Sequence, residues 1–145
     1  MKNISIPHSF FSVKYDGSKY PGKFENLKDG ANCQSFAYEI LRYFRYSIGN
    51  LRSSDLWDDK TYTRKVKKLI PLDIALFGKE MNAYGAHVGV CLGNNKIIHL
   101  SKEIGQPIIW DINEFKKYPK YKIFIGGKRI KNITATMLGD SATKN

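Results

Sequence analysis

The feature that most constrains the fold is a change of periodicity at Pro71. Before it, residues 33–46 carry apolar side chains at the spacing of one helical face. That stripe consists of Phe36, Ala37, Ile40, Leu41 and Phe44. Asn32 is a suitable N-cap, and Gly49 follows the end of the segment. After Pro71 the apolar runs are short, as in strands, so the chain predicts an α+β fold with one main helix on a mostly antiparallel sheet.

The expected strands are bounded by turn residues and rich in β-branched or aromatic side chains. They cover residues 74–77, 86–92, 96–101, 108–110 and 121–130. A helical turn is expected over 111–117, a bulge at Gly126 and Gly127, and a second short helix near 60–68. Residues 1–31 show no helical period and are expected to be extended or looped.

The length of 145 residues fits a single domain, placed at residues 1–130, with a polar tail over 131–145. Hydrophobic residues make up 42%, enough for one core. Pro7 and His8 interrupt the first apolar stretch, and no segment is long enough to span a membrane. We therefore expect a soluble protein without a classical signal peptide, either cytoplasmic or exported by a non-classical or phage-related route.

The chain is strongly basic, with 24 Lys and Arg against 13 Asp and Glu and a net charge of +11. Such an excess favours an anionic partner, for example an anionic wall polymer, an acidic membrane surface or nucleic acid. The lysines are scattered, however, which is also typical of an ordinary solvated surface. No nucleic-acid-binding motif is present, so nucleic acid is the partner with least support.

Of the two cysteines, Cys33 has the setting of a nucleophile. It stands at the first turn of the predicted helix, where the partial positive charge should lower its thiol pKa. Free N–H groups there could also bind an oxyanion. The alternative is a small buried side chain, which is how we interpret Cys91 within its apolar strand.

Two histidines, His87 and His99, lie in the strands on either side of Gly93-Asn94-Asn95. With a three-residue loop, the two histidines become diagonal neighbours on one face, about 7 Å apart. With a two-residue loop they fall on opposite faces. The three-residue register also gathers the valines and aliphatic residues of both strands on the other face, so we expect the histidines to meet.

This arrangement is typical of a thiol nucleophile with a base and an orienting group: Cys33, His87 and His99. Gly89 leaves space between the two rings. A metal site is the competing interpretation, with Asp73 as the nearest further ligand, but no ligand spacing supports it. The prediction is therefore catalysis without a metal.

Four segments together resemble the NlpC/P60 cysteine peptidases. They are DGANCQSF (29–36), PLDIALF (71–77), AHVGVCLG (86–93) and IIHLS (97–101). Their order and spacing resemble the family across residues 20–125. The resemblance implies a papain-like α+β domain in which a nucleophile helix packs on an antiparallel sheet. It also implies hydrolysis of amide bonds in peptidoglycan peptides, without a cofactor.

The resemblance assigns the roles of nucleophile, base and third polar residue to Cys33, His87 and His99. It implies that Tyr20 lines the site. It further implies substrate contacts around the nucleophile and along the histidine strand, at Asn32, Gln34, Ser35 and Gly89. Asn32, Gln34 and Ser35 differ from the Asp and Ser-Gly that the family usually carries around the cysteine.

Two other functions are compatible with these residues. The same triad would also serve on a non-wall intracellular peptide, isopeptide or acyl amide. A catalytically inert domain of the same fold would be a basic binding module. Thiol reactivity separates the enzymes from the binding module, and digestion of peptidoglycan separates the two enzymes.

Overall fold

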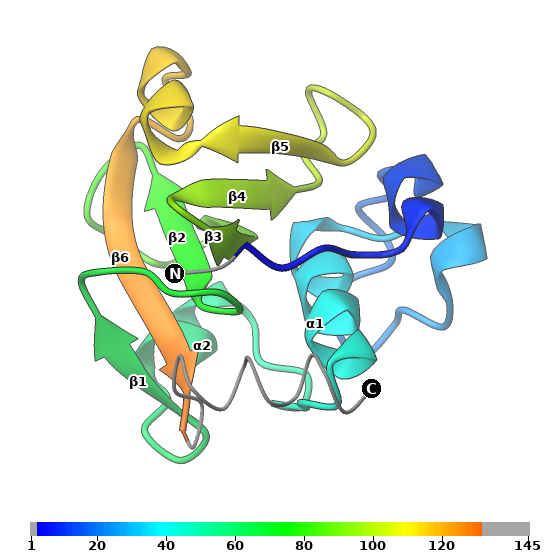
Figure 1. The fold of residues 1–145 in the computed structure, drawn as a ribbon, viewed down its shortest axis with the longest axis horizontal. Coiled ribbons are helices and arrows are strands. Elements are labelled where there is room, and N and C mark those ends of the chain that lie inside the picture. The colour runs from blue at the N-terminus through cyan, green and yellow to red at the C-terminus, as the bar shows by residue number, and fades with distance from the viewer. Residues whose placement is uncertain (1–2, 132–145) are drawn as a thin grey trace.

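The computed structural model describes residues 3–131, which form one antiparallel sheet flanked by helices (Figure 1). The α-helices and strands are α1 (Cys33–Tyr43), α2 (Ser53–Asp58), β1 (Thr63–Val66), β2 (Ile74–Gly78), β3 (His87–Gly93), β4 (Lys96–His99), β5 (Ile108–Asp111) and β6 (Ile123–Ile130). The 3-10 helices are η1 (His8–Ser12), η2 (Leu27–Asp29) and η3 (Ile112–Lys117). The strand order is β1-β6-β2-β3-β4-β5. The predicted combination of helix and antiparallel sheet is confirmed.

α1 begins where the sequence predicts because Asn32 caps it. The Asn32 side chain accepts hydrogen bonds from the N–H groups of Gln34 (3.0 Å) and Ser35 (2.9 Å). The Ser35 hydroxyl in turn accepts from the N–H of Asn32, at 3.0 Å. This reciprocal capping box stabilises a helix start by about 1 kcal/mol. The helix ends earlier than predicted, at Tyr43, because Arg45 adopts a left-handed conformation with φ 71°.

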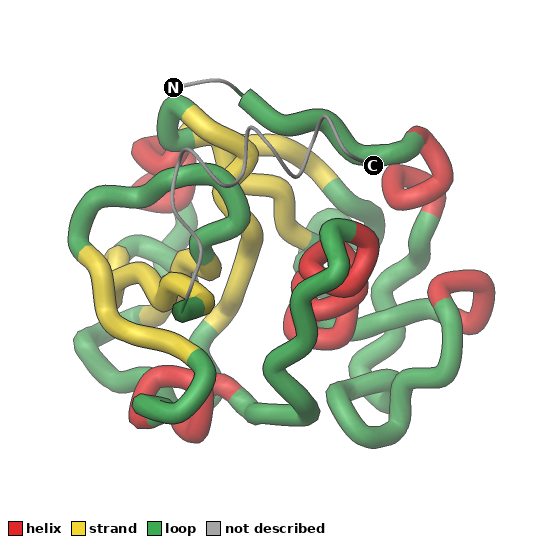
Figure 2. The backbone as a smooth tube through the Cα atoms, turned by 60° about the horizontal axis from the view of Figure 1, so that its bottom comes forward, coloured by secondary structure: helices red, strands yellow, loops and turns green. Residues whose placement is uncertain are grey.

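The sheet separates two clusters of apolar side chains. The first joins the stripe of α1 to one face of β2, β3 and β4, through Phe36, Ile40, Leu41, Ile74, Leu76, Val88, Val90, Ile98 and Leu100. The second lies between the other face and η3, and contains Ala75, Phe77, Cys91, Ile97, Trp110, Phe115 and Tyr121. Figure 2 shows the helices outside the strands, joined by long loops. Cys91 is fully buried in the second cluster, which confirms its predicted packing role.

The β3–β4 hairpin turns through two residues, not the predicted three. Asn94 and Asn95 have φ values of 50° and 59°, and Gly93 pairs with Lys96. Positive φ at both central positions is the signature of a type I′ turn, which asparagine tolerates better than most residues.

The register beyond this turn is nevertheless the predicted one. A bulge between Cys91 and Gly93 shifts the pairing by one residue, so that Val90 lies opposite Ile98. The extra residue in the bulge has the same effect on the strand register as the third loop residue of the prediction. His87 and His99 therefore emerge on the same face.

The short helix predicted near 60–68 is wrong. Helix α2 lies earlier, and Thr63–Val66 forms the edge strand β1, paired with β6. Exposed basic side chains such as Arg64 and Lys65 are typical of an edge strand, because they discourage further pairing. The expected bulge in β6 is present one residue before Gly126: Leu76 pairs with Gly126, and the next pair is Phe77 with Phe124.

The N-terminal segment runs from the sheet past α1 to η1, and is irregular apart from η1 and η2 (Figure 1). Within the part of the chain that the structure describes, no helix has the length and apolar character needed to cross a bilayer. Residues 132–145 of the predicted tail lie outside the described residues, and the single domain over 1–130 stays a prediction.

Candidate active site

The two predicted histidines meet on one face of the sheet. His87 is the first residue of β3 and His99 is the last residue of β4. Nε2 of His87 lies 2.8 Å from Nδ1 of His99, and the ring centroids are 5.0 Å apart. Both side chains are buried, with 8% and 0% of their surface exposed. The predicted juxtaposition is confirmed.

The bond between these nitrogens fixes the orientation of the His87 ring. If Nε2–H of His87 donates to Nδ1 of His99, His87 keeps its lone pair on Nδ1, which is the form a base needs. His99 then carries its proton on Nε2, which has no hydrogen-bond partner among the described residues. The rings of Trp110 and Phe115 surround it, with centroids 4.3 and 4.6 Å from that of His99. Their π faces can receive this N–H.

Burial keeps both histidines neutral. Loss of water around His87 lowers its pKa to about 4, although the Glu103 carboxylate acts in the opposite direction. Burial likewise lowers the pKa of His99 to about 2, assisted by repulsion from a protonated His87. Near neutral pH both rings are therefore uncharged, and an uncharged imidazole can accept a proton from a nucleophile.

Cys33 is the first residue of α1, and its half-buried thiol approaches the start of β3. The N–H groups of Val88, Gln34 and Cys33 itself favour the thiolate, but burial outweighs them and raises the thiol pKa. The predicted low pKa at the helix start is therefore wrong for the free protein. Among the described residues, no hydrogen bond joins the sulfur to the His87 ring; the sulfur is near the N–H of the next residue, Val88.

The helix start offers fewer free N–H groups than predicted. Those of Gln34 and Ser35 donate to the Asn32 cap, which leaves the N–H of Cys33 as the available donor of this turn. Ser35 also donates its hydroxyl to the carbonyl of Lys19, at 2.6 Å. Asn32 and Ser35 thus hold the helix in place, and their contact with substrate stays a prediction.

Gly89 is required by the close approach of β3 and β4 under His99. A Cβ at this position would lie 2.6 Å from Cγ2 of Ile97 and 3.1 Å from Cβ of His99. A distance under 3.0 Å cannot be accommodated without movement of the neighbours. The glycine therefore avoids a clash with β4. The predicted space between the two rings and the predicted contact with substrate stay predictions.

Arg52 is a residue that the sequence analysis did not select. Its Nε donates to Oε1 of Gln34 at 3.2 Å, and its guanidinium lies 4.6 Å from the ring centroid of Tyr20. These contacts hold an exposed cation next to the residue that follows Cys33, and its charge favours the thiolate. Gln34 and Tyr20 are thus brought together near Cys33. No ion pair involves Arg52 within residues 3–131, so its guanidinium is available to a carboxylate of a ligand.

Tyr121 and Glu103 are further residues that the sequence did not reveal. The Tyr121 ring stacks on His87 with centroids 4.4 Å apart, and its hydroxyl donates to Glu103 at 2.5 Å. Lys120 also binds Glu103, at 2.6 Å, and the two hydrogen bonds lower the pKa of Glu103 to about 2. A cavity of about 290 Å³ opens beside His87 and Tyr121. No local motif could have signalled these contacts, because the residues come from separate loops.

Asp73, the nearest further metal ligand by sequence, is paired elsewhere. Both of its carboxylate oxygens accept hydrogen bonds from Arg129, at 2.9 and 2.8 Å. Across residues 3–131, no group of three or more His, Cys, Asp and Glu side chains is arranged to hold a metal ion.

The buried histidine pair predicts a stability that falls in acid. The pKa values of His87 and His99 are lowered on folding, so the unfolded chain binds protons first as the pH drops from about 6.5 to about 4. Each histidine then lowers the free energy of unfolding by up to about 1.4 kcal/mol for each unit by which the pH falls. Urea denaturation across this range should show the decline in wild type and in the exposed-site control His8→Gln, and a shallower decline in His99→Gln. Identical pH dependence in His99→Gln and wild type would contradict this origin.

A scan of protein-family models found no match to this chain, and a search of curated proteins likewise found none.

Proposed function

We propose that this protein is a papain-like cysteine hydrolase that cleaves amide bonds. Cys33 acts as the nucleophile, His87 as the general base and His99 as the group that orients the base. The observation that carries the proposal is the 2.8 Å contact between Nε2 of His87 and Nδ1 of His99, beside the first turn of α1. That contact leaves the other nitrogen of His87 for the thiol, which is the arrangement a nucleophile–base pair requires.

The reaction starts from a neutral thiol and a neutral imidazole. The Cys33 sulfur attacks the amide carbon while Nδ1 of His87 takes the thiol proton, and the N–H of Cys33 faces the developing oxyanion. His87 then gives this proton to the departing amine, which leaves a thioester on Cys33. Water, deprotonated by His87, attacks the thioester and releases the acid and the free thiol. No redox partner or cofactor enters the balance.

Peptides of peptidoglycan are the substrate class that we favour. The exposed guanidinium of Arg52, which forms no ion pair within residues 3–131, is held beside Cys33 by Gln34 and Tyr20, and it suits a carboxylate near the scissile bond. The net charge of +11 adds a general attraction to an acidic wall. The resemblance of the segments around Cys33, His87 and His99 to wall peptidases points in the same direction.

Digestion of purified peptidoglycan tests this proposal. The wild-type protein should release fragments with a new amine terminus, detected by mass spectrometry, and Cys33→Ala should release none. Arg52→Gln should raise KM for a carboxylate-bearing peptide while leaving KM for a matched neutral amide nearly unchanged.

The outcomes separate the competing functions. Thiol-dependent cleavage of soluble acyl amides without cleavage of peptidoglycan would reject the wall substrate and retain the hydrolase. No cleavage of any amide by a folded protein would favour an inert binding module.

A further inference from the structure

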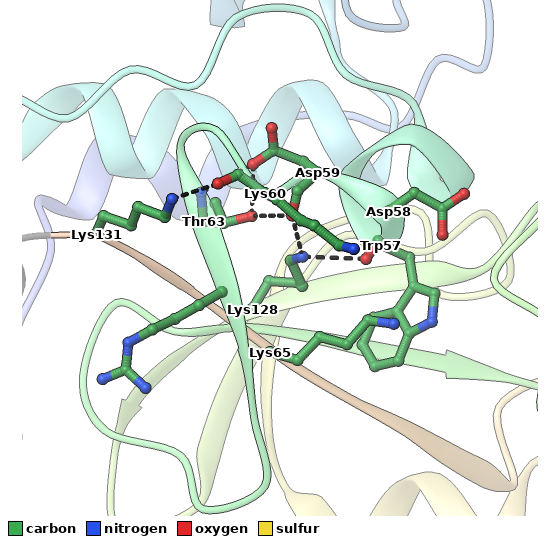
Figure 3. A pocket seen from close by; sticks show the side chains of 9 residues that line it. Trp57, Asp58, Asp59, Lys60, Thr63, Lys65, Lys128 and Lys131 are labelled. Atoms are coloured by element: carbon green, nitrogen blue, oxygen red, sulfur yellow. Dashed lines mark hydrogen bonds between the residues drawn. The ribbon is translucent and has the colours of Figure 1, made fainter.

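A second cavity lies between the end of α2 and strands β1 and β6 (Figure 3). Its volume is about 540 Å³, larger than the cavity beside His87. Cys33, His87 and His99 are not among its lining residues. Its chemistry is therefore independent of the proposed hydrolase.

The cavity is strongly basic. Its cationic lining residues are Lys60, Arg64, Lys65, Lys128 and Lys131. Only Asp58 and Asp59 oppose them, which leaves a formal excess of three positive charges. The Asp59 carboxylate is already engaged, because it accepts hydrogen bonds from the N–H and hydroxyl of Thr63 at 2.8 and 2.7 Å. Within residues 3–131, none of the five cations forms an ion pair with a carboxylate.

Lys128 places a buried ammonium at the base of this cavity. Only 1% of the residue is exposed, and its Nζ donates to the carbonyls of Trp57 (3.0 Å) and Asp59 (2.7 Å), as Figure 3 shows. An ammonium has three N–H donors, so one remains without an acceptor among the described residues. Burial lowers the pKa of Lys128, and a bound anion would favour its charged form.

The ring of Trp57 lies next to the ammonium groups of both Lys65 and Lys128. Nζ of Lys65 lies 4.3 Å from the centre of the indole ring and Nζ of Lys128 lies 5.9 Å from it (Figure 3). The position of the indole ring depends on the lack of a side chain at Gly126, where a Cβ would lie 2.6 Å from Cη2 of Trp57. The indole face attracts both ammonium groups and holds them ready for a ligand.

The pairing of β1 with β6 keeps these charges together at a cost. Lys65 lies directly opposite Lys128 in the ladder. Like charges at directly opposed positions destabilise a sheet, and an anion between them would reverse that effect. This pairing of two lining residues is a further reason to expect an anionic ligand in the cavity.

We propose that this cavity binds the phosphate groups of a polyol-phosphate polymer. A phosphate offers several acceptor oxygens to converging ammonium donors. A polymer would use Lys60 and Lys131 as well as Lys65. The indole of Trp57 is already covered by Lys65, so the cavity offers no free ring on which a nucleobase could stack. A phosphodiester chain without bases therefore fits better than nucleic acid.

The test measures binding of fluorescently labelled poly(glycerol phosphate) to the full-length protein at several salt concentrations. Lys60→Gln combined with Lys65→Gln should weaken binding about tenfold and reduce the slope of log Kd against log salt by about two. The matched control, Lys28→Gln combined with Lys116→Gln, removes the same charge from η2 and η3 and should bind like wild type. Melting temperatures of both variants establish that each is folded.

The same assay with a single-stranded oligonucleotide of equal charge decides the class of polymer. Weaker binding of the oligonucleotide than of poly(glycerol phosphate) is expected. Tighter, cavity-dependent binding of the oligonucleotide would overturn the choice of polymer. Equal losses in the test and control variants, or no binding of poly(glycerol phosphate), would overturn the site itself. None of these results depends on amide hydrolysis.

Discussion

Cys33→Ala is expected to reduce amide hydrolysis by at least about 10⁴-fold, because it removes the proposed nucleophilic sulfur. The side chain is half-buried and its sulfur forms no hydrogen bond to His87, so the change should leave the melting temperature nearly unaltered. Steady-state rates on a soluble amide substrate and thermal denaturation of the same samples measure both quantities.

Cys91→Ala is the matched control for this loss. Cys91 is fully buried in the cluster beneath η3, and its sulfur accepts a hydrogen bond from Gly93 at 3.4 Å. Its removal should lower stability modestly and preserve the catalytic rate constant of the folded protein. Substantial activity in Cys33→Ala, or abolished activity in a folded Cys91→Ala, would contradict the assignment of the nucleophile.

His87→Ala is expected to have the second largest effect, a loss of roughly 10³-fold in kcat, because it removes the proposed base for the thiol proton. His99→Ala should reduce the rate less, since His99 is proposed to orient the base without contact with the reacting atoms. Rates over a range of pH check these roles. Wild-type activity should persist down to about pH 4 to 5, because burial lowers the pKa of His87 to about 4.

The opposite ranking would contradict the roles. A larger loss in His99→Ala than in His87→Ala, with both variants folded, would make His99 the base. The fall in rate at acidic pH should also change in His99→Ala. If it does not change, His99 does not influence the protonation of His87.

The position of the histidine pair could be predicted because burial fixes the parity of a strand. Val88, Val90, Ile98 and Leu100 needed a common apolar face, and only one register supplied it. The details of the turn could not be predicted in the same way. A bulge at Cys91 and a two-residue turn give the same parity as a three-residue loop, so the hydrophobic pattern does not distinguish them.

The segment after α1 was less predictable because its structure depends on distant partners. Residues 63–65 are polar or basic, and they become part of a strand because the edge of β6 pairs with them. Such tertiary pairing overrides local propensity. The end of α1 depends on the left-handed conformation of Arg45, a residue type that gives no helix-stop signal.

The surroundings of the site were the least predictable part. Arg52, Glu103 and Tyr121 reach Gln34 and His87 from loops far apart in the chain, and no spacing rule connects them. The thiol pKa was predicted with the wrong sign for a related reason. The helix start favours a thiolate, but the extent of burial that opposes it becomes visible only once the chain is folded.

The reactivity of the Cys33 thiol tests the central claim most directly. Alkylation by iodoacetamide near neutral pH, followed by peptide mass spectrometry, gives separate rates for Cys33 and Cys91. Cys33 should react much faster than the buried Cys91, and His87→Ala should slow Cys33 by about tenfold, although a smaller side chain there can only improve access. An unchanged rate at Cys33 in His87→Ala would show that the imidazole does not activate the sulfur, and the proposed catalyst would be wrong.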